Sequence, residues 1–228
     1  MIYRETTQIA PKMCQSTIPK IGLKPGRDQD VWSYAIIGSG KVGTALARQF
    51  ARAGISVSIA NTRGPASIPS AVRELGQAVV PATVEAALEA EVLLLAIPFV
   101  AVEAFAKQRA DWSGKIVIDA TNAYGVTPEY MAGRLSSDIV AAAFRGAAIA
   151  KAFNQLPAAV LARDAAVENG RRVVFIASND EKATVEVKSL ALRLGFSPIV
   201  VGRIDESGRL LHIPGPLVLH NLVEYPFT

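Results

Sequence analysis

The sequence has few of the residues from which metal centres, disulfide frameworks and catalytic triads are built. It contains one cysteine, Cys14, and two histidines, His212 and His220, in 228 residues. One cysteine excludes an internal disulfide and a cysteine-rich metal site. Two histidines without clustered carboxylates or thiols make a poor metal site. We therefore expect no bound metal and no Ser/His/Asp-type catalytic side chain, and a reducing cytoplasm is the simplest setting.

Long apolar runs and dense charge runs are also missing. The longest apolar run, Val92–Phe99, is broken by Pro98 and falls well short of the roughly 18 residues that a membrane span needs. The first residues, MIYRETTQIAPKMCQ, contain no secretory h-region. The net charge of +4 comes from scattered Lys and Arg, which does not indicate nucleic acid but is compatible with small anionic ligands. We expect no membrane and no nucleic-acid partner.

What the chain does have is an alternation of apolar strands and helices from Tyr34 onward. Residues 1–31 carry three prolines and no sustained period, which predicts an irregular N-terminal extension. We predict strands at 34–37, 55–60, 78–80, 92–97, 115–119, 149–153, 172–177 and 197–201. We predict helices at 43–53, 70–75, 84–90, 100–110, in a stretch from Pro157, and from Asn179 or Asp180 to 194. This pattern indicates an α/β fold with a doubly wound, Rossmann-type parallel sheet covered on both faces. We place that domain at residues 32–145 and a small C-terminal α/β domain at 146–228.

Three glycines lie between the first predicted strand and its helix. Gly38, Gly40 and Gly43 form the pattern G-x-G-x-x-G, which is weak alone but is supported here by a strand before it and a helix after it. Gly38 permits the sharp turn, Gly40 lets a pyrophosphate approach the backbone, and Gly43 lets helix and strand pack closely. The helix start offers unpaired N–H groups to phosphates. The pattern therefore predicts a dinucleotide site, with Lys41 either beside the phosphates or solvated.

The end of the second predicted strand indicates which dinucleotide is bound. Units that bind NAD usually place an Asp or Glu there, to hold the ribose 2′-hydroxyl. This chain has Asn61, Thr62 and Arg63 instead. An arginine can pair bidentately with a 2′-phosphate, whereas a carboxylate would repel it. The sequence therefore favours NADP over NAD, the alternative being that Arg63 is an unengaged loop residue.

Further candidate residues follow the later strands, because ligands of such sheets bind outside the carboxyl ends of the strands. We expect Pro98 and Phe99 to lie along the nicotinamide ribose and ring, and Thr121 or Asn122 to touch the carboxamide. Asn154 ends the next strand near the same edge. Each of these polar residues has a second interpretation, since Asp, Thr and Asn also satisfy strand-end backbones without a ligand.

The chain resembles a known family across 34–223, in the ordered segments IIGSGKVGTALA, ANTR, LLLAIP, DATN, KAFNQLPA, RRVVFIASND, LGFSPIVVG and GRLLHIPGPL. It is similar to the 8-hydroxy-5-deazaflavin:NADPH oxidoreductases and to the cytoplasmic reductase domain of the six-transmembrane epithelial antigen metalloreductases. The resemblance implies NADP binding by Gly38, Ser39, Gly40, Lys41, Val42, Gly43, Asn61, Thr62 and Arg63, with the nicotinamide by Ala96, Ile97 and Pro98. It also implies that 8-hydroxy-5-deazaflavin (coenzyme F420) is a co-substrate, facing Ala152–Leu156 and Pro214–Leu217. The family often has two glycines before Pro-Leu, where this chain has only Gly215.

Other activities remain open at this stage. Hydride transfer needs two stacked rings and no acid–base side chain, because the cofactors carry the chemistry. The alternatives are an NADPH-dependent flavin or ferric reductase, an imine reductase of the β-hydroxyacid dehydrogenase type, and an NADP-binding sensor without turnover. We also predict a homodimer sealed by Leu217–Val223, Tyr225 and Phe227. The alternative is that this apolar tail packs on its own domain.

Overall fold

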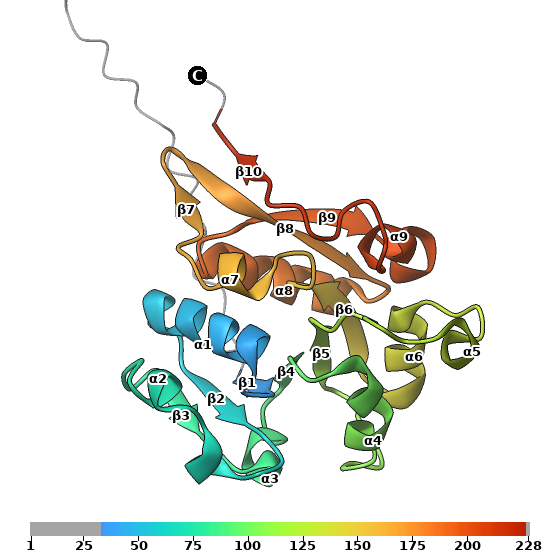
Figure 1. The fold of residues 1–228 in the computed structure, drawn as a ribbon, viewed down its shortest axis with the longest axis horizontal. Coiled ribbons are helices and arrows are strands. Elements are labelled where there is room, and N and C mark those ends of the chain that lie inside the picture. The colour runs from blue at the N-terminus through green and yellow to red at the C-terminus, as the bar shows by residue number, and fades with distance from the viewer. Residues whose placement is uncertain (1–32, 227–228) are drawn as a thin grey trace, which may run out of the picture. The chain divides into compact units, whose positions relative to one another are not determined.

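Strands and helices alternate along the chain from Tyr34 onward (Figure 1). The computed structural model describes residues 33–226, so the predicted extension at 1–31, Cys14 and Phe227 lie outside the described part. The first part of the fold contains β1 (Tyr34–Ile37), α1 (Lys41–Ala53), β2 (Val57–Ala60), α2 (Ser70–Arg73), β3 (Val79–Pro81), α3 (Val84–Ala87), β4 (Val92–Leu95), α4 (Val102–Ala106) and β5 (Ile116–Asp119). Short 3-10 turns, Pro65–Ser67 and Phe99–Ala101, precede α2 and α4.

The second part of the fold continues the same sheet. It contains α5 (Pro128–Met131), α6 (Ser136–Ala143), β6 (Ala148–Ala152), α7 (Ala158–Leu161), β7 (Ala166–Val167), β8 (Gly170–Ser178), α8 (Glu181–Arg193), β9 (Ser197–Gly202), α9 (Ile204–Leu211) and β10 (Val223–Glu224). The predicted domain boundary, residues 145/146, lies between α6 and β6. β6 pairs with β5 in parallel across it, so the sheet runs on through both predicted domains.

The sheet is parallel over six strands and then reverses. Its order is β3-β2-β1-β4-β5-β6-β8-β10, and the strands from β3 to β6 are parallel. β8 runs antiparallel to β6, while β9 runs parallel to β8. The predicted α/β fold with a parallel sheet is confirmed, and the antiparallel pairing begins only beyond β6. A short hairpin of β7 and β8 turns the chain back there.

Helices cover both faces of the sheet, as predicted. One buried cluster includes Phe50 of α1, Leu161 of α7 and Val187 of α8, and Figure 1 shows these three helices together on one side. The other cluster includes Val102 of α4 and Ile139 of α6.

Several predicted helix ends are confirmed and several helices are new. Gly54 ends α1 in the left-handed conformation, with φ of 65°. Asp180 caps α8 by accepting a hydrogen bond from the N–H of Ala183 at 2.7 Å. The helix predicted at 100–110 is shorter, because a 3-10 turn occupies its start and α4 ends at Ala106. The sequence analysis assigned no helix to α5, α6 or α9. No helix within residues 33–226 has the length and apolarity needed to cross a membrane.

Candidate functional site

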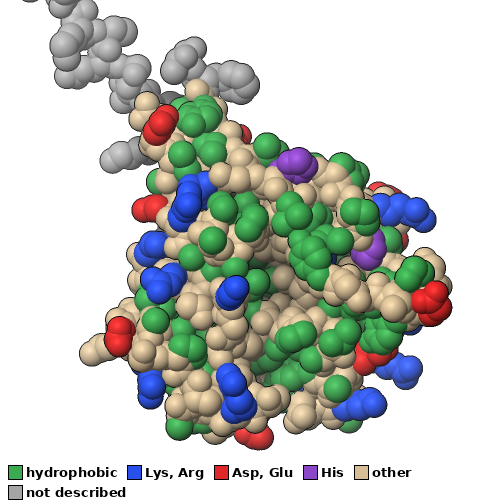
Figure 2. All heavy atoms as spheres, viewed as in Figure 1, with side chains coloured by type: hydrophobic (Ala, Val, Ile, Leu, Met, Phe, Trp, Pro, Cys, Tyr) green, Lys and Arg blue, Asp and Glu red, His purple; other side chains and the backbone are tan. Residues whose placement is uncertain are grey.

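A cavity of about 400 Å³ lies against the carboxyl ends of β1, β2 and β4. Figure 2 shows a hollow near the middle of the face that it presents, with hydrophobic side chains along the rim of the hollow. The cavity is lined by predicted site residues and by further residues from the end of β1, from α3 and from α4 with its flanking turns. The predicted ones are Gly38, Ser39, Gly40, Asn61, Thr62, Arg63, Ala96, Ile97 and Pro98; the others are Ile37, Val84, Ala101, Ala104, Phe105 and Gln108.

The three glycines of the turn differ in what surrounds them. A Cβ on Gly38 would lie 2.3 Å from the carbonyl oxygen of Ala96, and Gly38 has a φ of +111°. A Cβ on Gly43 would lie 1.8 Å from the carbonyl oxygen of Gly38. These two positions exclude a side chain through contacts within the protein. A Cβ on Gly40 would meet no atom within 4 Å, and its φ of −76° is ordinary. The protein's own packing therefore does not require glycine at position 40.

The start of α1 has the character of an anion-binding helix end. Gly40 is the N-cap and supplies no side-chain acceptor, and the first turn contains no acidic residue. The first hydrogen bond into the helix runs from the N–H of Thr44 to the carbonyl of Gly40. The preceding N–H groups of the first turn are therefore available to a ligand. Lys41, on the exposed side of this turn, does not line the cavity, and neither do Val42 and Gly43.

Asn61 joins the glycine turn to the loop after β2. Its Nδ2 donates to Ser39 Oγ at 2.7 Å, while its Oδ1 accepts from the N–H of Arg63 at 2.8 Å and from Ser67 Oγ at 2.9 Å. The Asn61 amide is thus occupied within the protein. Thr62 and Arg63 are exposed beside it, and the guanidinium of Arg63 contacts no carboxylate within residues 33–226. Arg63 is the cation free to pair with an anionic group in the cavity.

Thr121, Asn122 and Asn154 lie at the ends of β5 and β6, outside the lining of this cavity. Asn122 Nδ2 donates to the carbonyl of Asn154 at 2.7 Å, and Asn154 Nδ2 donates back to Asn122 Oδ1 at 3.0 Å. Asn154 Nδ2 also donates to the carbonyl of Leu211 at 2.8 Å. Asn154 Oδ1 is buried and has no hydrogen-bond partner within the described residues. The structure brings these predicted residues together with each other and with the end of α9.

Two further groups lie at this edge, Lys151 and His212, the second of which could border the acceptor pocket or be a core-edge histidine. Lys151, which the sequence analysis placed only in a strand, forms a buried ion pair with Asp119 at 2.8 Å. The signal in the sequence was a lysine inside an apolar strand. At the end of α9, His212 Nδ1 accepts a hydrogen bond from the N–H of Ser136 at 3.3 Å. Burial and the charge of Lys151 lower the pKa of His212, which favours the neutral ring with its proton on Nε2.

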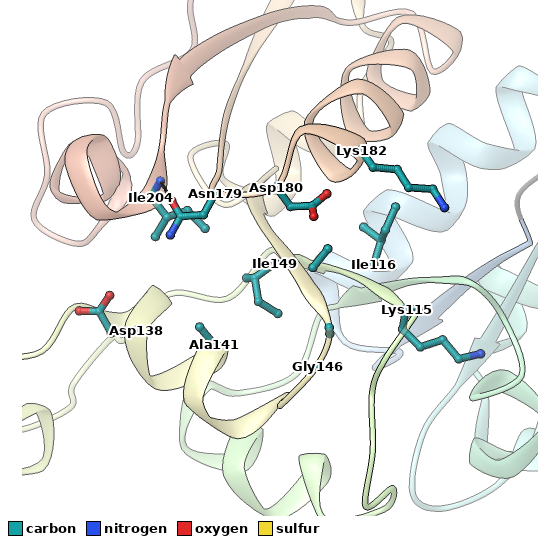
Figure 3. Close-up of a pocket in the computed structure, with 13 residues that line it drawn as sticks. Lys115, Ile116, Asp138, Ala141, Gly146, Ile149, Asn179, Asp180, Lys182 and Ile204 are labelled. Atoms are coloured by element: carbon teal, nitrogen blue, oxygen red, sulfur yellow. Dashed lines mark hydrogen bonds between the residues drawn. The ribbon is translucent and has the colours of Figure 1, made fainter.

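A second cavity, of about 460 Å³, opens near the amino ends of β5 and β6. Figure 3 shows residues from α6 on one side of it and residues from the start of α8 on the other. Asp138 and Asp180 each accept from a backbone N–H at the start of their own helix, and Asn179 accepts from the N–H of Ile204. Lys115 donates to two backbone carbonyls. These groups are used for helix ends, so the cavity at the glycine turn is the candidate site.

Comparison with known proteins finds relatives across most of this fold. A sequence model of the family described as NADP oxidoreductase, coenzyme F420-dependent, matches residues 33–123. The crystal structure of a hypothetical protein, SMa0349, from Sinorhizobium meliloti is 42% identical, with a TM-score of 0.81, covering 85% of this chain and 96% of that chain. A putative F420-dependent NADP reductase from Arthrobacter sp. FB24 is 24% identical, with a TM-score of 0.60, covering 77% and 87%. That second likeness supports the fold alone.

A curated relative is similar over a smaller share of its own length. The metalloreductase STEAP3 of Rattus norvegicus is 27% identical over 180 residues, which is 78% of this chain. The chain spans only 36% of that relative.

Proposed function

We propose that this chain binds NADP(H) beside Gly40 and transfers a hydride between NADPH and a planar acceptor, because residues 33–123 match the family described as NADP oxidoreductase, coenzyme F420-dependent. We propose the deazaflavin coenzyme, 8-hydroxy-5-deazaflavin, as that acceptor. The dinucleotide, when bound, supplies the hydride chemistry. The chain's own residues bind its phosphates, orient its rings and keep water from the reacting carbons.

The space beside Gly40 carries this proposal. Gly38 and Gly43 are explained by backbone contacts at 2.3 and 1.8 Å, but no neighbouring atom explains Gly40. Gly40 lines the cavity at the start of α1. A pyrophosphate approaching the backbone accounts for a glycine there, and the free N–H groups of the first turn are the donors it would meet. The residues present therefore fit a dinucleotide diphosphate.

The loop after β2 supports NADP rather than NAD. No carboxylate lines the cavity, whereas Arg63 does. Thr62 Oγ1 and Ser39 Oγ lie in the same lining, and Ser39 Oγ accepts from Asn61, which leaves its proton for a ligand. A doubly charged 2′-phosphate is matched by this set of donors and repelled by none of its members.

The acceptor is proposed from the family and from the place of the remaining site residues. The family description and the name of the Arthrobacter protein both specify F420. Asn154, Phe153 and the turn at Pro214–Leu217 would border the acceptor ring at the edge formed by β5 and β6. The name of the rat relative supports a second candidate, an NADPH-dependent flavin or ferric reductase. A sensor that binds NADP without turnover is the third.

Two measurements test the proposal. Equilibrium titration with NADPH and NADH is expected to show binding with a clear preference for NADPH. Stopped-flow oxidation of NADPH is then followed with coenzyme F420, FMN and a ferric chelate offered in turn, and F420 is expected to give the fastest turnover. Faster turnover with FMN or the chelate would select the second candidate. Tight binding with no oxidation would select the sensor, and absence of dinucleotide binding would refute all three.

A further inference from the structure

A buried ion pair joins β5 and β6 where the two strands end. The Nζ of Lys151 lies 2.8 Å from Oδ2 of Asp119, and the two side chains are 2% and 0% exposed. They are register partners on adjacent parallel strands. Apolar residues of similar volume often stabilise a fold as well as a buried ion pair or better. Stability alone therefore gives no reason for charges at these two positions.

The pair holds Thr121 by every polar group that this residue has. Asp119 Oδ1 accepts from the N–H of Thr121 at 2.9 Å and from its hydroxyl at 2.6 Å. Lys151 Nζ donates to the carbonyl of Thr121 at 2.6 Å. Because the hydroxyl proton is already donated, Thr121 Oγ1 offers only lone pairs to a ligand. A carboxamide beside Thr121 would therefore donate its N–H to this oxygen.

Hydrogen bonds also link the residue after Thr121 to the end of β6. Asn122 follows Thr121 and forms the reciprocal amide contact with Asn154. Between Lys151 and Asn154 the chain passes through Phe153, which is buried and has a φ of +61°. That conformation is unfavourable for a residue other than glycine, so surrounding contacts must impose it. Hydrogen bonds thus connect the ion pair to the ends of both strands, next to the end of β4, which borders the candidate cavity.

We infer that Lys151, paired with Asp119, is a positioning residue for the hydride transfer, because it fixes Thr121 and Asn122 where the nicotinamide ring is to be oriented. This inference rests on the proposed function, and it names the residues that would orient the nicotinamide end of the bound dinucleotide. Neither member of the pair lines the cavity that contains Gly40 and Arg63. Gly40 and Arg63 would therefore bind the phosphates, whereas Lys151 and Asp119 would act only on the orientation of the nicotinamide ring.

The test replaces both charges together, as Asp119→Leu/Lys151→Met, so that no charge is left buried alone. The dissociation constant for NADPH is expected to change less than about threefold. Neither substituted residue lines the cavity that would hold the phosphates, and sites without shared contacts behave nearly independently. The fluorescence anisotropy of the bound nicotinamide is expected to fall, which reports ring mobility without any acceptor. The rate of hydride transfer is expected to fall at least about tenfold, since a misplacement of about 1 Å can cost about 100-fold.

A matched control removes a second ion pair far from this edge. Glu186 and Arg193 of α8 lie 3.3 Å apart beside Tyr34, at the amino end of β1. Glu186→Leu/Arg193→Met is expected to leave the anisotropy and the rate unchanged. If the first double variant does not fold, Asp119→Asn/Lys151→Gln is measured in its place, because amides keep hydrogen bonds between the strands but remove both charges.

The outcomes separate the inference from the proposed function. A folded pair variant with the parent's anisotropy and rate would overturn the inference while leaving the proposed function intact. A lower anisotropy and a slower rate with nearly unchanged NADPH affinity would support it. A parent protein that binds no NADPH would overturn both.

Discussion

Gly43 lies directly against Gly38, so that a Cβ on Gly43 would fall 1.8 Å from the Gly38 carbonyl oxygen. Backbone therefore touches backbone where α1 crosses the end of β1. Gly40, between them, has open space on its Cβ side. Packing thus requires glycine at positions 38 and 43 but not at position 40, which makes their substitutions distinguishable.

Gly40→Val is expected to fold normally but to lose dinucleotide binding. Its stability should stay within about 0.5 kcal/mol of the parent, as for surface substitutions away from special features. Gly43→Ala is expected to lower the free energy of unfolding by about 3 kcal/mol, at the upper end of the usual cost of overpacking. Chemical denaturation and NADPH titration of both variants provide the measurements. A folded Gly40→Val protein that still binds NADPH would contradict the site.

Arg63→Ala is expected to weaken NADPH binding and to affect NADH little. Arg63 is the exposed cation of the cavity lining, and a hydrogen bond to a charged group is worth about 1.5–3 kcal/mol, or roughly 10-fold to 100-fold in affinity. Arg73→Ala, an exposed arginine at the end of α2, is the control. Equal losses for the two dinucleotides would show that Arg63 does not hold the 2′-phosphate.

Protonation of His212 is expected to destabilise the protein at mildly acidic pH. Burial, followed by the charge of Lys151, lowers the pKa of His212 below its ordinary value of 6.5, and Asp138 opposes this shift. The folded state therefore favours the neutral ring. The contribution of neutral His212 to the free energy of unfolding is fully present above the unfolded-state pKa of this residue. That contribution is lost as the pH falls through the unfolded-state pKa toward the folded-state pKa. Protonated Nδ1 could no longer accept from the N–H of Ser136.

The measurement for His212 is the free energy of unfolding in urea between about pH 8 and about pH 5, the range in which histidine titrates. His212→Gln should flatten the decline, because a glutamine carbonyl can accept without titrating. His220→Gln, at an exposed position, is the control and should keep the parent's profile. A decline of the same size in all three proteins would place the titration elsewhere.

The predicted homodimer can be tested at the apolar tail. Leu219, Leu222 and Tyr225 are 56%, 45% and 51% exposed in the single chain. Leu219→Lys/Leu222→Lys is expected to halve the mass found by analytical ultracentrifugation, because buried unpaired lysines are costly at an interface. Leu192→Lys on α8, exposed to 47%, should not change the mass. An unchanged mass in the tail variant would exclude this surface as the interface.

Local signals in the sequence were enough to predict the first βα unit. The glycines of the turn, the apolar run before them and Gly54 after the helix all lie within one short segment, 34–54, so their order alone indicates strand, turn and helix. The direction of β8 was not predictable in this way, because a continuous apolar run is the same for either direction. The α9 helix was hidden by Gly208, since glycine costs about 1 kcal/mol in a helix interior. In the fold this glycine lets α9 approach Leu135 and Ser137 closely.

For the candidate site, the sequence predicted which strand ends contribute but not how their side chains are used. Asn122 and Asn154 were predicted as ligand contacts, and the structure shows them bound to each other across 32 positions. Asn61 likewise ties Ser39 to the next loop. Such contacts join residues distant in the chain, so they follow from strand order and register, which periodicity does not specify. The cofactor roles of these residues stay predictions.

The pairing of β5 with β6 across the predicted domain boundary, residues 145/146, affects any attempt to produce residues 32–145 alone. A chain truncated there would keep Asp119 in β5 but lose the strand that carries Lys151. The truncation would also leave β5 without its hydrogen-bonded neighbour over Ile116–Asp119, so that a buried apolar strand would become an exposed sheet edge. Residues 32–145 are therefore not expected to fold as an independent unit, because β6 supplies Lys151, the partner of the buried Asp119.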